Sequence, residues 1–232
     1  KQIEEPNIHE IEYPLKEMWK ANYFPSAGKY SLEKIKQKKA PLLKELFSVF
    51  GGTTPRPIFL RKGKNKSEKQ THLLHAWQAK CIANVKELTA PEFKRDFLTK
   101  KLPGEIAKLS FLDDGPRLVV ELLGLRGIYV VVEKQLPKTY LDGASFLAPS
   151  GNPIIGMTLR FDRLDNFWFT LLHELGHVYA DIHDNSEAFF DSNENFSKQN
   201  EDPRERKANN FAANALIPNE LWKENRPILI NS

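Results

Sequence analysis

Apolar residues in the first half of the chain recur every three or four positions, which is the spacing of one helix face. This pattern predicts helices over residues 11–23, 31–50, 67–88 and 109–125. Ser31 is a typical cap for the second helix, and Pro41 predicts a kink or a split in it, because proline removes a backbone donor.

A different spacing begins after the fourth predicted helix. Residues 128–133 read Ile-Tyr-Val-Val-Val-Glu, a β-branched run that is typical of a strand. Segments 144–147 and 154–159 are further strand candidates, and glycine and proline predict turns at Gly143 and over 149–153. The pattern therefore predicts a small three-stranded sheet.

Two more helices are expected after the sheet. The first is capped near Asp165 and runs to about residue 182, and the second opens near Pro203 and ends before Pro218. The polar, acidic segment 184–203 between them predicts a loop. Helices, then strands, then helices again are typical of an α+β fold.

Charge divides the chain into two parts. Residues 1–110 hold 22 Lys and Arg against 12 Asp and Glu, a net charge of +10, and residues 111–232 hold 12 against 18, a net charge of −6. Such an asymmetry indicates two parts with different partners. We expect a basic, helix-rich N-terminal region over 1–110, consisting of a linker and a helical subdomain, and a strand-then-helix domain over 111–232.

Composition narrows the class of protein. Hydrophobic residues make up 41% of the chain and charged residues 28%, as in ordinary globular domains. No apolar run approaches the roughly 20 residues of a membrane helix, and the first ten residues do not resemble a signal peptide. The single cysteine, Cys81, cannot form an internal disulfide. We therefore expect a cytoplasmic protein with no membrane partner.

The candidate chemistry lies in the helix predicted after the sheet, where residues 173–177 read His-Glu-Leu-Gly-His. His173 and His177 stand one turn apart on one helix face, so both imidazoles can reach a single zinc ion at about 2.1 Å. Glu174 is turned about 100° around the helix, which aims it at a water on the metal. This arrangement predicts hydrolysis with Glu174 as the general base. An ordinary pair of surface histidines is the alternative, but the apolar residues around the motif favour the metal site.

A catalytic zinc ion takes three protein ligands, so a third residue is needed. The candidates follow the motif in the chain: Asp181, His183, Asp184, Glu187, Asp191 and Glu205. Glu205 is the best placed, because it begins a separate helix that can face the first. His183 falls near the end of the same helix as the histidine pair, which is a poor position from which to turn back to the metal.

Two stretches resemble the ImmA/IrrE family of metallopeptidases. One is residues 160–177, and the other is residues 205–218, which read Glu-Arg-Lys-Ala-Asn-Asn-Phe-Ala-Ala-Asn-Ala-Leu-Ile-Pro. The second is similar to the family segment Glu-x-x-Ala-Asn-x-Phe-Ala-x-x-x-Leu-(Leu/Ile/Met)-Pro, with one departure at 214–215, where a pair such as Glu-Leu is commoner. The resemblance implies a zincin-like domain of the Glu type, with an HExxH active-site helix and with His173, His177 and Glu205 as zinc ligands.

Weaker similarities at residues 11–18 and 75–77 resemble a longer subgroup of the family, the HigA-type antitoxin regulators with an upstream helix-turn-helix domain. Such a domain would precede Lys1, and DNA would be bound only through it. The resemblance implies a zinc endopeptidase whose protein substrate is a helix-turn-helix repressor or antitoxin-type regulator. The alternative is a non-proteolytic transcriptional regulator or antitoxin module that uses the metal site for sensing or stability.

Three further residues are candidates for supporting roles. Asn209 lies one turn after Glu205 and could orient a ligand, or could be a polar residue that only packs between helices. Tyr179 and His183 could stabilise an oxyanion, although a helix of this kind often simply ends in polar residues.

Overall fold

The computed structural model describes residues 12–51, 68–159, 163–180, 189–192 and 203–217. The described helices and strands are, in chain order, α1 (Leu15–Lys20), α2 (Leu32–Gln37), α3 (Lys39–Phe47), α4 (Glu68–Val85), α5 (Leu102–Leu109), α6 (Gly115–Gly124), β1 (Tyr129–Val132), β2 (Leu141–Leu147), β3 (Pro153–Met157), α7 (Leu164–Ala180), β4 (Phe189–Ser192) and α8 (Pro203–Leu216). Short 3-10 turns occupy Pro25–Ala27, Ser48–Phe50 and Arg95–Phe97.

The strands form one mixed sheet in the order β1-β3-β2-β4. Strand β1 runs parallel to β3, and β2 runs antiparallel to both of its neighbours, β3 and β4. The α+β class and the three predicted strands are confirmed. The prediction of loop over 184–203 is wrong at β4, which reads Phe-Phe-Asp-Ser, because pairing with β2 supplies the backbone hydrogen bonds of a strand. Gly143, predicted in a turn, lies within β2.

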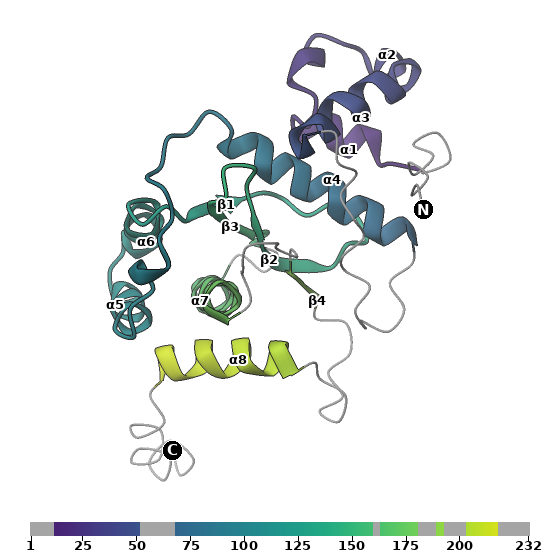
Figure 1. The fold of residues 1–232 in the computed structure, drawn as a ribbon. Coiled ribbons are helices and arrows are strands. Elements are labelled where there is room, and N and C mark those ends of the chain that lie inside the picture. The colour runs from purple at the N-terminus through teal and green to yellow at the C-terminus, as the bar shows by residue number, and fades with distance from the viewer. Residues whose placement is uncertain (1–11, 52–67, 160–162, 181–188, 193–202, 218–232) are drawn as a thin grey trace, which may run out of the picture.

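The elements stack in layers around this sheet (Figure 1). Helix α4 covers one face of the sheet and α7 covers the other, with α8 packed on the outer side of α7. Helices α5 and α6 close one end of this stack, and α1 to α3 gather at the far side of α4. The predicted boundary at residue 110 stays a prediction, but α4 and α5, which precede it, pack against the sheet and α8 respectively.

Helix α4 is buried on nearly all sides, because it lies between α1–α3 and the sheet. Trp77 sits at its centre, fully buried, with its indole nitrogen donating to the carbonyl of Glu133. A Cβ on Gly156 of β3 would lie 2.4 Å from the Trp77 ring, so only glycine lets this ring reach the sheet. Among the described residues no helix, α4 included, combines the length and hydropathy that a membrane span requires.

The helix boundaries confirm the predicted split and cap of one helix and correct another helix. The segment 31–50 is split into α2 and α3 at Lys38, three residues before Pro41, and Ser31 caps α2 by accepting from the backbone of Lys34. The single helix predicted over 109–125 is wrong. Its first part is a turn that ends at Gly115, where a Cβ would lie 2.0 Å from the carbonyl oxygen of Leu109. Proline follows that glycine, and proline is tolerated only in the first turn of a helix.

His75 of α4 gives the fold a predicted dependence on pH. Burial, and to a smaller extent the charge of the neighbouring His72, lower the pKa of His75 from 6.5 to about 4. The unfolded chain therefore takes up this proton before the folded chain does. The stability that neutral His75 contributes is complete above pH 6.5 and is lost as the pH falls toward 4. We expect the free energy of unfolding to drop in this window by roughly 1–3 kcal/mol more than in a His75→Gln variant.

Urea denaturation of both proteins at intervals between pH 7 and pH 4 measures this difference. An NMR titration of the His75 ring in the folded protein checks the cause directly. A ring that protonates near pH 6.5 in the folded state would contradict the prediction.

Candidate metal centre

Helix α7 carries the predicted motif and is anchored on its apolar sides. Its residues Leu171, Leu172, Leu175 and Val178 are buried in a core shared with α5, α6 and β3. Asp165 lies in the first turn of α7, where a negative charge interacts favourably with the helix dipole and stabilises the helix. The apolar sides therefore fix the rotation of α7, and with it the direction in which the motif side chains point.

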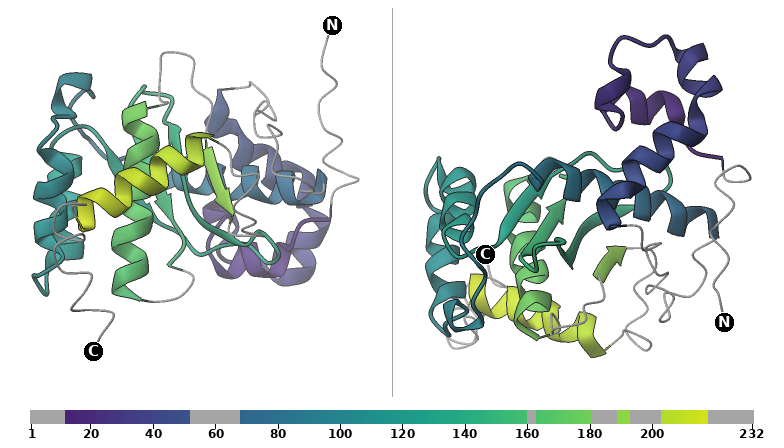
Figure 2. Two further views of the ribbon diagram at one scale, coloured as in Figure 1. Left: turned by 90° about the horizontal axis from the view of Figure 1, so that it is seen from below. Right: turned by 45° about the horizontal axis from the view of Figure 1, so that its top comes forward.

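Helix α8 crosses α7 at close range (Figure 2). The crossing occurs at Gly176, where a Cβ would lie 3.2 Å from the Cα of Ala208 and 3.2 Å from the ring of Phe211. Ala208 and Ala212, one turn apart on α8, are both buried in this contact. Small residues on both helices allow the two backbones to approach, and this approach brings the start of α8 to the histidine pair.

Three side chains meet at this crossing. His173 Nε2 lies 3.1 Å from His177 Nε2, and the two nitrogens lie 3.3 and 3.4 Å from the carboxylate oxygens of Glu205. The side chains of His173 and His177 are 2% and 1% exposed, whereas that of Glu205 is 28% exposed. Within the described residues, this is the group of His, Cys, Asp and Glu side chains whose donor atoms converge as metal ligands do.

The donor atoms have the separations that a zinc ion requires. Ligand atoms about 2.0–2.1 Å from an ion at the centre of a tetrahedron lie about 3.3–3.4 Å from one another. The two Nε2 atoms are 3.1 Å apart, and the distances of 3.3 and 3.4 Å run from them to different oxygens of Glu205, so the group is close to this spacing. Two imidazoles and one carboxylate are also donors that zinc accepts. The residues present therefore fit a zinc ion.

Asn209 orients one of the histidines. Its side-chain oxygen lies 2.9 Å from His173 Nδ1. Because an amide oxygen only accepts hydrogen bonds, this contact places a proton on Nδ1, and in the neutral ring it leaves a lone pair on Nε2, the atom that faces Glu205. Of the two readings of Asn209, the contact favours the one in which it orients a ligand.

The two histidines also influence the ionisation of Glu205. Burial raises the pKa of this carboxyl, but in the metal-free site the hydrogen bonds and charge of His173 and His177, when these rings are protonated, outweigh burial and lower the pKa to about 2. Glu205 is therefore a carboxylate at neutral pH, which is the form that coordinates a cation.

The Glu174 side chain contacts strand β2 of the sheet. Its carboxylate is 0% exposed and accepts a hydrogen bond of 2.6 Å from Ser145 of β2. Neither Ser145 nor Gly143, which lies beneath the same carboxylate, was singled out from the sequence as a site residue. In the sequence, the only sign of a role for Ser145 was a serine within the otherwise apolar segment 144–147. That sign could not show that α7 would pack on the face of β2 from which Ser145 projects.

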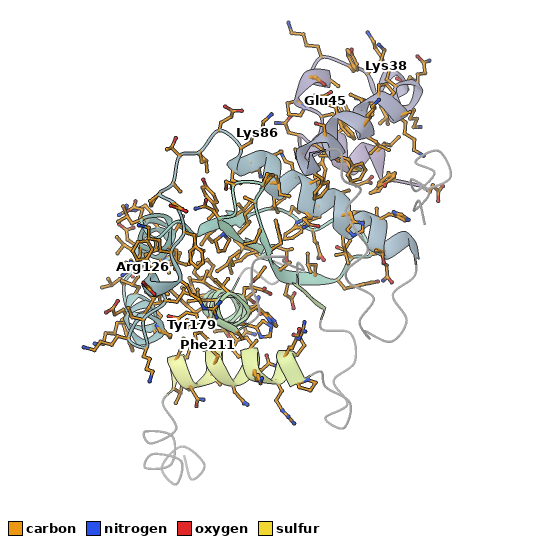
Figure 3. All side chains as sticks on the ribbon, in the orientation of Figure 1. Lys38, Glu45, Lys86, Arg126, Tyr179 and Phe211 are labelled. Carbon is orange, nitrogen blue, oxygen red and sulfur yellow. The ribbon has the colours of Figure 1, made fainter. Side chains whose placement is uncertain are left out.

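Of the other two candidates, the structure describes Tyr179, which lies outside the cluster. The Tyr179 hydroxyl donates to the carbonyl of Thr99, and burial raises the pKa of Tyr179 to about 12. Its ring packs against Phe211 at 4.9 Å between centroids, on the side of α7 near α5 (Figure 3). This geometry lends no support to an oxyanion role for Tyr179. His183 lies outside the described residues, as do Asp181, Asp184 and Glu187.

Residues 126–226 match the family model described as the IrrE N-terminal-like domain, of peptidase family M78. The matched region runs from just before β1 beyond the end of α8, so it contains the three convergent side chains, Glu174 and Asn209. The match supports the ImmA/IrrE family for this part of the chain and points to a metallopeptidase-like domain. No curated protein sequence and no solved structure matches the chain.

The close helix crossing yields a testable expectation for metal affinity. A Gly176→Val substitution adds side-chain atoms where a Cβ alone would lie 3.2 Å from the Cα of Ala208. We expect α8 to shift outward, carrying Glu205 with it, and zinc affinity to fall by about 10- to 100-fold, with a loss of stability of about 1–3 kcal/mol.

Zinc titration in competition with a chelating dye measures the change in affinity. Gly104→Val in α5 is the matched control, because a Cβ at Gly104 meets nothing within 4 Å. Equal zinc affinity in the two variants would show that the crossing does not control the site.

Proposed function

We propose that this chain is a zinc-dependent endopeptidase of the Glu-type zincin class, with His173, His177 and Glu205 as the metal ligands and Glu174 as the general base. The observation that carries the proposal is the meeting of three side chains, with nearest donor atoms 3.1–3.4 Å apart. His173 and His177 belong to α7, which also carries Glu174, and Glu205 belongs to α8. The family match over residues 126–226 supports the same class of chemistry.

The number of donors favours a catalytic site over a structural one. Structural zinc sites use four protein ligands, whereas catalytic sites use three and keep one position for water or substrate. In the described part of the chain, the convergent group consists of His173, His177 and Glu205, with no fourth His, Cys, Asp or Glu. A structural site would also have no use for a buried glutamate directly after its first ligand.

Each residue has a separate task in the proposed reaction. When bound, the zinc ion would polarise the scissile carbonyl and make water a better nucleophile at neutral pH. Glu174 accepts a proton from the attacking water and delivers it to the leaving amine. Asn209 holds the His173 ring so that its Nε2 lone pair points into the cluster. The buried apolar sides of α7 keep these groups rigid, which is what such a site requires.

The proposed substrate is a helix-turn-helix repressor or antitoxin-type regulator, as the resemblance to HigA-type relatives implies. DNA would be reached only through an upstream domain. A cytoplasmic location is part of the same proposal and is supported by the buried, unpaired thiol of Cys81, since reduced cysteine is usual in that compartment.

Metal content tests the ligand assignment. The purified protein is expected to hold about one zinc ion per chain, and His177→Ala is expected to hold far less, because two ligands do not retain zinc through dialysis. Elemental analysis of both proteins gives the result, with His72→Ala as a control, since His72 lies on α4. An unchanged zinc content in His177→Ala would remove the basis of the assignment.

Glu174→Gln tests the general base. Glutamine has nearly the same size but cannot accept the proton, so kcat/KM is expected to fall by about 100- to 10,000-fold while zinc content and melting temperature stay unchanged. Glu87→Gln, at an exposed position after α4, is the control for loss of a carboxylate. A Glu174→Gln variant with wild-type activity would rule out this role.

The substrate proposal is tested by incubating the zinc-loaded protein with purified helix-turn-helix repressors and antitoxin-type regulators. Mass spectrometry is expected to show one cleavage that requires zinc and Glu174. If the protein holds one zinc ion per chain and binds one of these regulators without cleaving it, the result would instead support the alternative function, a non-proteolytic regulator.

A further inference from the structure

Strand β2 presents different residues to the two helices that sandwich the sheet. Because successive side chains of a strand point to opposite faces, Phe146 contacts Trp77 of α4, at 6.4 Å between ring centroids, while Ser145 and Gly143 face α7. Strand β2 is also paired on both sides, with β3 and with β4. A side chain on this strand therefore has a rigid base.

Ser145 contacts Glu174 twice. Its hydroxyl oxygen lies 2.6 Å from Glu174 Oε2 and 2.9 Å from the backbone oxygen of the same residue. Both side chains are 0% exposed. A separation of 2.6 Å is in the range of a hydroxyl that donates to an ionised carboxylate, and such bonds are about twice as strong as neutral ones. The bond joins the sheet to the one acidic side chain of the motif.

Gly143 forms the floor of the same slot. A Cβ at this position would lie 2.9 Å from Glu174 Oε1, 3.0 Å from Glu174 Cγ and 2.8 Å from a methyl carbon of Thr170. The carboxylate therefore occupies space that any other residue at 143 would fill. Two positions on β2, one without a side chain and one with a hydroxyl, shape the place where the carboxylate rests.

We propose that Ser145 is a positioning residue for the reaction, and that with Gly143 it holds the Glu174 carboxylate in the orientation from which it accepts the proton of the attacking water. This inference rests on the proposed function. Misplacement of a reacting group by about 1 Å can cost about 100-fold in rate. Ser145 acts through Glu174 and has no role in holding the metal, so its removal changes kcat and leaves KM and zinc content unchanged.

The first experiment compares Ser145→Ala and Gly143→Ala with the wild type. The first variant removes the hydroxyl, and the second keeps it but displaces the carboxylate. Both are expected to lower kcat by about 10- to 100-fold on a quenched fluorescent peptide that spans the cleavage site, with KM and bound zinc unchanged. Ser145→Thr keeps the hydroxyl and is expected to restore kcat.

Thr158→Val is the matched control. Thr158 also donates a 2.6 Å hydrogen bond from a buried hydroxyl to β2, at the carbonyl of Leu141, but does not reach Glu174. It is expected to lower the melting temperature about as much as Ser145→Ala does, with kcat unchanged. If Thr158→Val lowers kcat as much as Ser145→Ala, or if Ser145→Ala has wild-type kcat, the positioning role is overturned.

A second readout does not depend on turnover. Acetohydroxamic acid chelates zinc as acetohydroxamate and passes its hydroxyl proton to a carboxylate beside the metal, so its affinity reports where that carboxylate lies. Calorimetry on the zinc-loaded proteins is expected to show binding about tenfold weaker in Ser145→Ala and Gly143→Ala, and unchanged in Ser145→Thr and Thr158→Val. Unchanged affinity in Ser145→Ala would overturn the inference.

The two proposals fail in different ways. If the wild type binds zinc and acetohydroxamate but cleaves no peptide, the endopeptidase proposal is wrong, and the acetohydroxamate series alone decides whether Ser145 positions Glu174. If the wild type binds no zinc, both proposals are wrong.

Discussion

The candidate site depends on how closely α7 and α8 approach each other at Gly176. The donor atoms of His173 and His177 lie on one helix and belong together by helix geometry alone, but Glu205 belongs to another helix and reaches them only through this contact. A Cβ on Gly176 would lie 3.2 Å from the Cα of Ala208, so a larger residue at 176 would push the two helices apart. A zinc site tolerates errors of only about 0.2 Å in its bond lengths, and the small residues at the crossing make that accuracy attainable.

Helix α7 is held from two sides, and each side controls a different part of the proposed chemistry. Toward α8, His173 contacts Asn209 and Glu205. Toward the sheet, Glu174 contacts Ser145. Neighbouring positions on a helix point about 100° apart. The group proposed to bind metal is therefore held by residues of α8, and the group proposed to move protons is held by a residue of β2. A substitution in the α8 contacts can therefore alter metal affinity without altering the position of Glu174. A substitution in the β2 contacts can alter the rate without altering metal affinity.

Helix α4 connects the basic N-terminal helices to this arrangement. It shares one buried cluster with α1–α3 and another with the sheet, where Trp77 lies against Gly156. Its buried surface includes polar side chains such as His75, which burial keeps neutral at physiological pH. The charge boundary near residue 110 thus does not coincide with a gap in the packing. Helix α4 belongs to the basic region before that boundary, yet it packs directly on the sheet, which follows the boundary.

The sequence by itself determined what is local: the α+β class, the three predicted strands, the Ser31 cap and the i, i+4 spacing of His173 and His177. These follow from backbone periodicity and from side chains that act within a few residues. It also favoured Glu205 as the third ligand, because a separate helix was needed. Tertiary structure alone decided the rest. Strand β4 exists through its pairing with β2, Ser145 meets Glu174 across the sheet and α7, and Gly176 sets the distance between two helices. Such contacts join residues distant in the chain, and their geometry depends on how whole elements pack, which no local pattern of hydrophobic and polar positions records.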